Sequence, residues 1–229
     1  MATTKKTHPT AQRDEPPSDP SDSAVLAQLE LLGGRICLDF INSVDPRIGD
    51  QQHDYLASYA DLAQWSAHAH LLTPDQLAAL LRAAEQHPRQ AGAVFARAIA
   101  LRETLYRVFT TLAAHQPPAA TDLAALQSAY LETMAQSHLL PSPDGYQWRW
   151  SEDSHTLDQM LWPIITSAVD LLTSPEARRV KVCPGLGDCG WLFLDISKSG
   201  RRRWCSMDSC GSRSKMRRYY ARTHTPTVE

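Results

Sequence analysis

Four cysteines close to the C-terminus are the feature that most constrains how this chain can fold. They follow the pattern C-x5-C-x15-C-x4-C, at Cys183, Cys189, Cys205 and Cys210. Two cysteine pairs separated by about 15 to 20 residues are the recurring plan of a zinc site. Four thiolates complete the tetrahedral shell of Zn²⁺ and leave no position open for water. The pattern therefore predicts one structural zinc ion held by all four sulfurs.

The rest of the chain favours metal over disulfides as the use of these thiols. The N-terminal stretch has no apolar core of a signal peptide. No apolar run reaches the roughly 18 residues of a membrane span. We therefore expect a cytoplasmic protein without a membrane partner, in which thiols stay reduced. The fifth cysteine, Cys37, lies between Ile36 and Leu38 and is expected to be an ordinary buried residue.

The residues around the four cysteines predict a small module of knuckle, β-hairpin and helix. Glycine and proline between the first two cysteines allow a tight turn. Alternation over 191–196 predicts a strand that returns as a second strand over 201–204. Asp208 or Ser209 is expected to cap a helix that begins near Cys210. This order is treble-clef-like, with the last ligand in the first turn of the helix.

Charge divides the chain into a basic module and an acidic body. Residues 178–222 carry twelve Lys/Arg and three Asp/Glu, whereas the remainder carries eleven and 22. Uncompensated positive charge on so small a module suits phosphate contacts. Arg201 to Arg203 are expected to meet phosphates, and Arg213 and Arg217 to reach base edges. The full expected nucleic-acid surface is Lys198, Arg201, Arg202, Arg203, Arg213, Lys215, Arg217, Arg218 and Arg222. Alternatively, the charge faces the acidic body, solvent or another partner.

Helical spacing dominates the body expected over 25–175. Capping-box patterns over 58–61 and 73–76 begin two helices. Apolar residues at helical spacing predict further helices over 89–114, 121–136 and a segment from Leu157 to Leu172. Pro163 either starts or kinks the last of these. Because these stripes supply a core of their own, we expect the body to stay folded without the finger.

Two segments of the body depart from the helical pattern. Residues 138–150 alternate around Pro-Asp-Gly and predict a β-hairpin. Residues 29–47 fit a strand and a helix equally well. The expected fold is mainly α with a small β-hairpin (α+β), followed by the treble-clef-like zinc finger over 176–224. Residues 1–24 are rich in proline and polar residues, and are expected to form a disordered tail.

Two stretches resemble known families. FLDISKSGRRRWCSMDSCGSRSKMRRYYAR (193–222) is similar to the CGNR zinc finger of bacterial proteins, with Ser212 in place of the motif's asparagine. GGRICLDFINSV, which begins at Gly33, resembles the opening of the ABATE domain that accompanies this finger. The resemblance implies a helix-rich regulatory domain, a treble-clef-type finger and a role in stress-linked transcription regulation. Serine can still hydrogen-bond near a helix start, so the fold is expected to tolerate Ser212.

The expected function is a transcription regulator that binds DNA through the four-cysteine finger. A finger this small needs a dimer or a second module for specificity, so the body is expected to form a homodimer. The body is alternatively expected to sense a small-molecule effector. The alternative is an RNA- or protein-binding adaptor that uses the same basic surface. Catalysis is not expected, because Asp39, Asn42, Asp45 and His53 suit caps and turns. A pocket around Asp39 and Asn42 would favour a sensing or a catalytic role.

Overall fold

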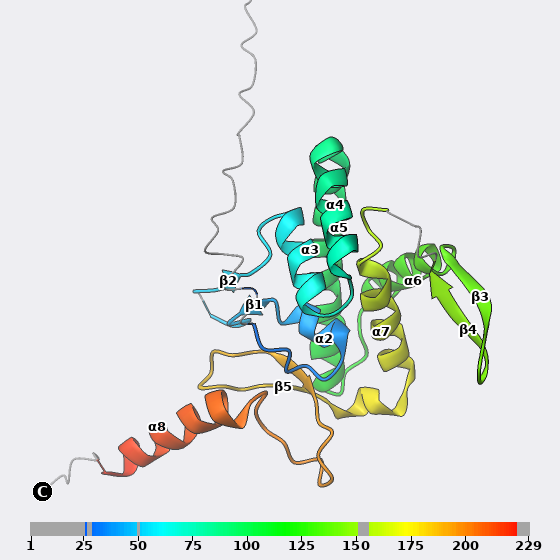
Figure 1. Ribbon diagram of the computed structural model, residues 1–229. Helices are drawn as coiled ribbons and strands as arrows, with labels where there is room; N and C mark the ends of the chain where they lie inside the picture. The colour runs from blue at the N-terminus through cyan, green and yellow to red at the C-terminus, as the bar shows by residue number, and fades with distance from the viewer. Residues whose placement is uncertain (1–25, 27–28, 50, 151–155, 224–229) are drawn as a thin grey trace, which may run out of the picture.

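The computed structural model describes residues 26, 29–49, 51–150 and 156–223 (Figure 1). The expected tail over 1–24 lies outside this part of the chain. The elements in chain order are α2 (Ile36–Ile41), β1 (Val44–Asp45), β2 (His53–Asp54), α3 (Tyr59–His68), α4 (Pro74–Gln86), α5 (Pro88–Ala113), α6 (Ala120–Met134), β3 (Ser137–Ser142), β4 (Gly145–Trp150), α7 (Leu161–Thr173), η1 (Pro175–Arg179), β5 (Val180–Val182), β6 (Leu192–Leu194), the π-helical turn η2 (Met207–Gly211) and α8 (Ser212–Thr223). The prediction of a mainly α fold with a small β-hairpin is confirmed, and β1–β2 and β5–β6 form further antiparallel pairs.

The predicted caps begin two helices of the body. The Ser58 side chain accepts a hydrogen bond from the Asp61 amide at 3.2 Å and starts α3. Thr73 and Gln76 form a reciprocal capping box at the start of α4, where each side chain accepts from the other's backbone N–H. These bonds satisfy amides that the first helical turn leaves without partners. Both helices therefore begin where their local capping residues predict.

Helix α7 resolves the question of Pro163. The helix begins at Leu161, so Pro163 lies in its first turn, where a missing N–H costs no helical hydrogen bond. Leu157 was expected inside this helix but precedes it. Its side chain is buried, and its carbonyl accepts a hydrogen bond from the Tyr59 hydroxyl at 2.9 Å. Leu157 therefore closes the core ahead of the helix.

The predicted hairpin is present, and Figure 1 shows it extending away from the helices. Strands β3 and β4 pair antiparallel, with Leu139 opposite Trp148. At the base of the hairpin the Trp150 ring lies 6.1 Å from the ring of Trp162 on α7. Towards its tip, Trp148 and Tyr146 are exposed. The contact between Trp150 and Trp162 therefore anchors the base of the hairpin to α7.

The ambiguous segment 29–47 contains the short helix α2. Cys37, Leu38, Phe40 and Ile41 of this helix are all fully buried. Four apolar residues within five positions can all be buried only where the helix is surrounded, and α2 packs against both α5 and α7. Burial raises the pKa of the Cys37 thiol to about 12, as suits an inert core cysteine.

The core of the body continues into the finger. Phe40 of α2, Leu105 of α5 and Ile164 of α7 belong to the same buried cluster as Leu192 and Phe193 of β6. The Leu194 amide donates to the Gly33 carbonyl at 2.8 Å, which joins β6 to the loop before α2. Two parts that share one core and a backbone hydrogen bond stabilise each other. Among the described helices, none is long and apolar enough to cross a lipid bilayer.

Candidate metal centre and nucleic-acid interface

The four predicted zinc ligands meet at one point. Their sulfur atoms all lie within 4.8 Å of one another. The Cys205 sulfur lies 3.8 Å from the sulfurs of both Cys189 and Cys210. Zn–S bonds of about 2.3 Å at tetrahedral angles place sulfurs roughly 3.8 Å apart. All four cysteines are buried and free of disulfides. The set fits one structural zinc ion with no open coordination position.

The first two ligands lie in the loop that joins β5 to β6. The Cys183 amide donates to the Trp191 carbonyl at 2.7 Å, and the Gly190 amide donates to the Cys183 carbonyl at 3.0 Å. Gly185 between them has a φ of 50°, and a Cβ there would come within 2.6 Å of the Cys189 Cβ. Only glycine fits that approach, so the predicted tight knuckle is built as the glycines suggested.

The last ligand lies in η2, just before α8. The cap of this turn is Ser206, whose hydroxyl accepts from the Ser209 amide at 3.3 Å. The expected caps, Asp208 and Ser209, were therefore wrong: Asp208 lies within the turn, and Ser209 supplies the amide that is capped. Because η2 is capped by Ser206, its turn carries Cys210 to a buried position beside the other three sulfurs. The requirement to place this ligand explains where the turn begins. Ser212 donates to the Met207 carbonyl at 3.0 Å, so it hydrogen-bonds locally as expected.

The expected second strand over 201–204 is also wrong. Strand β6 pairs antiparallel with β5, and Arg201 to Trp204 form no strand. Asp195, which is 1 % exposed, accepts from the Arg202 amide and from the Ser197 amide, each at 3.0 Å. Lys181 donates to the Asp195 carboxylate at 2.6 Å and to the Gly200 and Arg202 carbonyls. These two side chains satisfy the backbone groups that a strand ladder would otherwise pair.

The hydrogen bonds of the finger shift the pKa values of two charged groups, Asp195 and Arg213. Burial alone raises the pKa of Asp195, but hydrogen bonds from Lys181 and Ser197 outweigh it and hold that pKa well below its usual range. The Arg213 guanidinium lies 3.3 Å from the Cys210 sulfur. Its hydrogen bond to that sulfur raises the pKa of Arg213 and ties the guanidinium to the cysteine cluster. Arg213 is nevertheless an exposed residue, and the base contact expected of it stays a prediction.

Hydrogen bonds among the sulfurs lower the pKa of Cys183 and raise those of Cys189 and Cys205. Four thiols this close cannot all ionise unless a cation compensates their charge. A divalent metal supplies that compensation, which is a second reason why the cluster suits zinc.

The Arg202 side chain is partly buried against the finger, whereas Arg201 and Arg203 are exposed. Its guanidinium donates to the Trp204 carbonyl at 3.0 Å and to the Cys205 carbonyl. It also stacks over the Phe193 ring, 4.6 Å from the centroid. Arg202 therefore holds the loop around Cys205. Most of the other expected nucleic-acid residues are exposed on the outer side: Lys198, Arg201, Arg203, Lys215, Arg217, Arg218 and Arg222.

A groove of about 420 Å³ lies between the knuckle and α8. Ser214 donates to the Gly185 carbonyl at 3.0 Å, which ties the helix to the knuckle. The basic and aromatic residues that line the groove are Arg203, Trp204, Arg217 and Arg218. The Arg203 guanidinium lies 5.2 Å from the Trp204 ring centroid. Guanidinium groups around an aromatic ring suit phosphates and bases. Trp204 was missed from the expected surface, although an aromatic residue among arginines signals such a site.

Asp39 and Asn42 lie where the body meets the finger. The Asn42 amide brackets Leu192, donating to its carbonyl at 2.8 Å and accepting from its N–H at 2.9 Å. The Asp39 carboxylate accepts from the Gly33 amide at 2.7 Å, and its burial raises its pKa to about 6. Asn42 thus joins the body to strand β6 of the finger, whereas Asp39 fixes the loop before α2 within the body. The ligand pocket expected around them stays a prediction.

Comparison with known families agrees with this geometry. Residues 34–175 match ABATE, described as "Putative stress-induced transcription regulator". Residues 179–223 match the CGNR zinc finger. None of the curated proteins compared with the chain matches it. The first match covers well over half of the sequence and the second covers the four cysteines. The chain therefore belongs to the ABATE family and carries a C-terminal CGNR zinc finger.

Proposed function

We propose that this protein is a transcription regulator that binds duplex DNA through the outer surface of its zinc finger. The observation that carries the proposal is the charge of that surface, where seven exposed Lys and Arg side chains besides Arg213 lie between residues 198 and 222. Closely spaced cations of this kind neutralise phosphates and release counterions. Because four sulfurs fill the coordination shell, the zinc ion would stabilise the fold that presents this surface. We propose no catalytic role for it.

Helix α8 supports the proposal. None of its residues is buried, and Figure 1 shows it projecting away from the body. A helix that is basic on most faces gains little stability from packing against its own chain, because it has no apolar stripe to bury. The major groove of DNA accommodates such a helix, with its side chains on phosphates and base edges. Arg213, whose guanidinium contacts the Cys210 sulfur, and Arg217 remain the candidates for base contacts.

The helical body would then sense a small molecule or hold two copies together. One finger of this size contacts few base pairs, so a dimer or a second module is needed for specificity. The body reaches the finger through α2, α5 and α7, which gives either role a physical route.

A second candidate function is RNA binding through the same surface. Tyr219 and Tyr220 on α8 are exposed, and Trp204 lines the groove. Aromatic rings among arginines stack unpaired bases as well as they accompany a duplex. Competition between duplex DNA and single-stranded RNA separates the two. A preference for RNA would favour this alternative.

Exchanging Lys198, Arg201 and Arg203 for alanine together is expected to weaken the salt dependence of DNA binding. Each phosphate that the variant no longer neutralises reduces the slope of log affinity against log salt by about 0.9. Affinity should fall by a similar factor for all duplex sequences, while zinc content stays unchanged. Fluorescence anisotropy of labelled duplex DNA at several salt concentrations measures the slope.

The matched control replaces Arg82 and Arg89, which are exposed on α4 and α5 away from the finger. This variant loses charge as well, and its slope should remain that of the wild type. Arg202 is left intact in both variants, because removing it would disturb the zinc loop. If the triple variant keeps the wild-type slope, the loop after β6 makes no phosphate contacts and that part of the proposal fails.

A further inference from the structure

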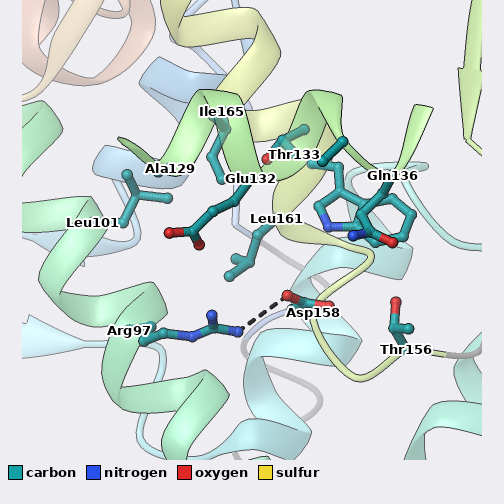
Figure 2. Close-up of a pocket in the computed structure, with 12 residues that line it drawn as sticks. Arg97, Leu101, Ala129, Glu132, Thr133, Gln136, Thr156, Asp158, Leu161 and Ile165 are labelled. Carbon is teal, nitrogen blue, oxygen red and sulfur yellow. Dashed lines mark hydrogen bonds and ion pairs between the residues drawn. The ribbon is translucent and has the colours of Figure 1, made fainter. Parts of the chain in front are cut away.

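The helical body contains a cavity that the proposed DNA surface does not explain. It has a volume of about 500 Å³ and lies between α5, α6 and the first turns of α7 (Figure 2). Leu101, Leu161, Trp162 and Ile165 supply most of its apolar wall. A volume of a few hundred cubic ångströms with apolar walls and a few polar groups is typical of small-molecule sites.

The polar groups of the cavity carry more negative than positive charge. Arg97 pairs with Asp158 at 3.1 Å along one edge, so its charge is already compensated. Figure 2 shows the Glu132 carboxylate on the side of Leu101 and Arg97. In the part of the chain that the structure describes, the one partner of this carboxylate is the Ser128 hydroxyl at 3.5 Å. Glu132 is therefore an exposed carboxylate at the rim of the apolar wall, and no ion pair of the described residues includes it.

We infer that this cavity binds a small organic cation with an apolar body. The apolar part would lie against Leu161 and Ile165, where its burial is favourable. The charged head would reach Glu132, the carboxylate that lacks a counter-ion. Trp162 adds an aromatic ring to the same wall, and aromatic rings attract amines and quaternary ammonium groups. An anionic ligand is disfavoured, because it would have to compete with Asp158 for Arg97 and lie near Glu132.

The inference gives the proposed sensing role of the body a site and a ligand class, and it rests on that role. Helix α7, which supplies part of the cavity wall, continues along the chain through η1 into β5, the strand before Cys183. The cavity is therefore connected to the finger by consecutive elements. Helix α5 contacts β5 as well. Binding to the cavity is nevertheless measured on the full chain without DNA. A failure of DNA binding by the finger would therefore leave this measurement intact.

Three probes with the same apolar body and different heads test the inference: phenylbutylamine, phenylbutanol and phenylbutyrate. Titration calorimetry or ligand-observed NMR on the full chain should rank the amine above the alcohol and the alcohol above the acid. Glu132→Gln should weaken amine binding by roughly threefold, the size expected of a partly exposed ion pair, and leave alcohol binding unchanged. Glu85→Gln, an exposed acid on α4, is the matched control and should change neither.

A second variant tests the location of the site. Ala129 lines the cavity and is half-buried, so Ala129→Phe should fill part of it and weaken all three probes by about tenfold. Thermal melting checks that this variant is folded. Three outcomes would overturn the inference: no binding by any probe, equal or tighter binding of the acid, or amine binding that Glu132→Gln leaves unaltered.

Discussion

Replacing Cys205 with serine is expected to release the zinc ion and unfold the finger. The Cys205 sulfur lies 3.8 Å from the sulfurs of Cys189 and Cys210, and its loss leaves three of the four ligands to hold the ion. Structural zinc contributes about 10–16 kcal/mol to the folding of small fingers, which is comparable to the whole stability of a typical domain. Elemental analysis should show the zinc content fall from one ion per chain to almost none.

The effect should extend into the body. We expect the helices to persist, as their own apolar stripes predict, but with a lower Tm, because α2 loses the cover of Leu192 and the bonds from Asn42. Circular dichroism measures both quantities. Cys37→Ala is the matched control, since Cys37 is a buried cysteine outside the zinc cluster and its loss should leave zinc bound. A Cys205→Ser protein that retains its zinc would contradict the assigned ligand set.

Asp195→Ala should have the second-largest effect. Its carboxylate is buried and holds Lys181 together with the amides of Ser197 and Arg202. Alanine leaves a half-buried ammonium and two backbone donors without their partner. Breaking a fully buried ion pair from one side costs about 3–5 kcal/mol, and the 35 % exposure of Lys181 places the expected cost at the lower end, about 3 kcal/mol. The free energy of unfolding, measured by denaturant titration at neutral pH, should fall by about that amount.

The control for this variant is Asp208→Ala. Asp208 is an exposed acid in the same finger, and no ion pair of the described residues includes it. Its removal should change the free energy of unfolding by less than about 0.5 kcal/mol. If both variants lose the same stability, Asp195 and Lys181 do not hold the loop after β6 as the structure indicates.

The zinc site was predictable because its signal is local and chemical. Residue type and spacing identify the ligands before any fold is known, and glycine in the knuckle reports the turn between them. The starts of α3 and α4 were predictable for the same reason, since a cap and its amide lie within one turn. The family resemblance then supplied the domain architecture.

The features that were missed depend on contacts between distant residues. The pattern of residues 201–204 predicted a strand, but Lys181, some 20 positions earlier, donates to the carbonyls of Gly200 and Arg202. Arg202 and Arg213 look like unattached surface cations in sequence, whereas Arg202 stacks on Phe193 and the guanidinium of Arg213, although exposed, lies 3.3 Å from the Cys210 sulfur. Helix α2 is short, and only its burial between α5 and α7 distinguishes it from a strand. The spacing of apolar residues along the chain carries no information about these contacts between residues distant in sequence.

The proposed function requires that the finger, and not the body, contacts DNA. Hydrogen–deuterium exchange of the full chain with and without duplex DNA tests this most directly. We expect slower exchange on DNA binding at amides of residues 198–203 and of α8, with exchange in α4 and α5 unchanged. Protection confined to the helical body, or no protection at a DNA concentration that saturates binding, would contradict the account.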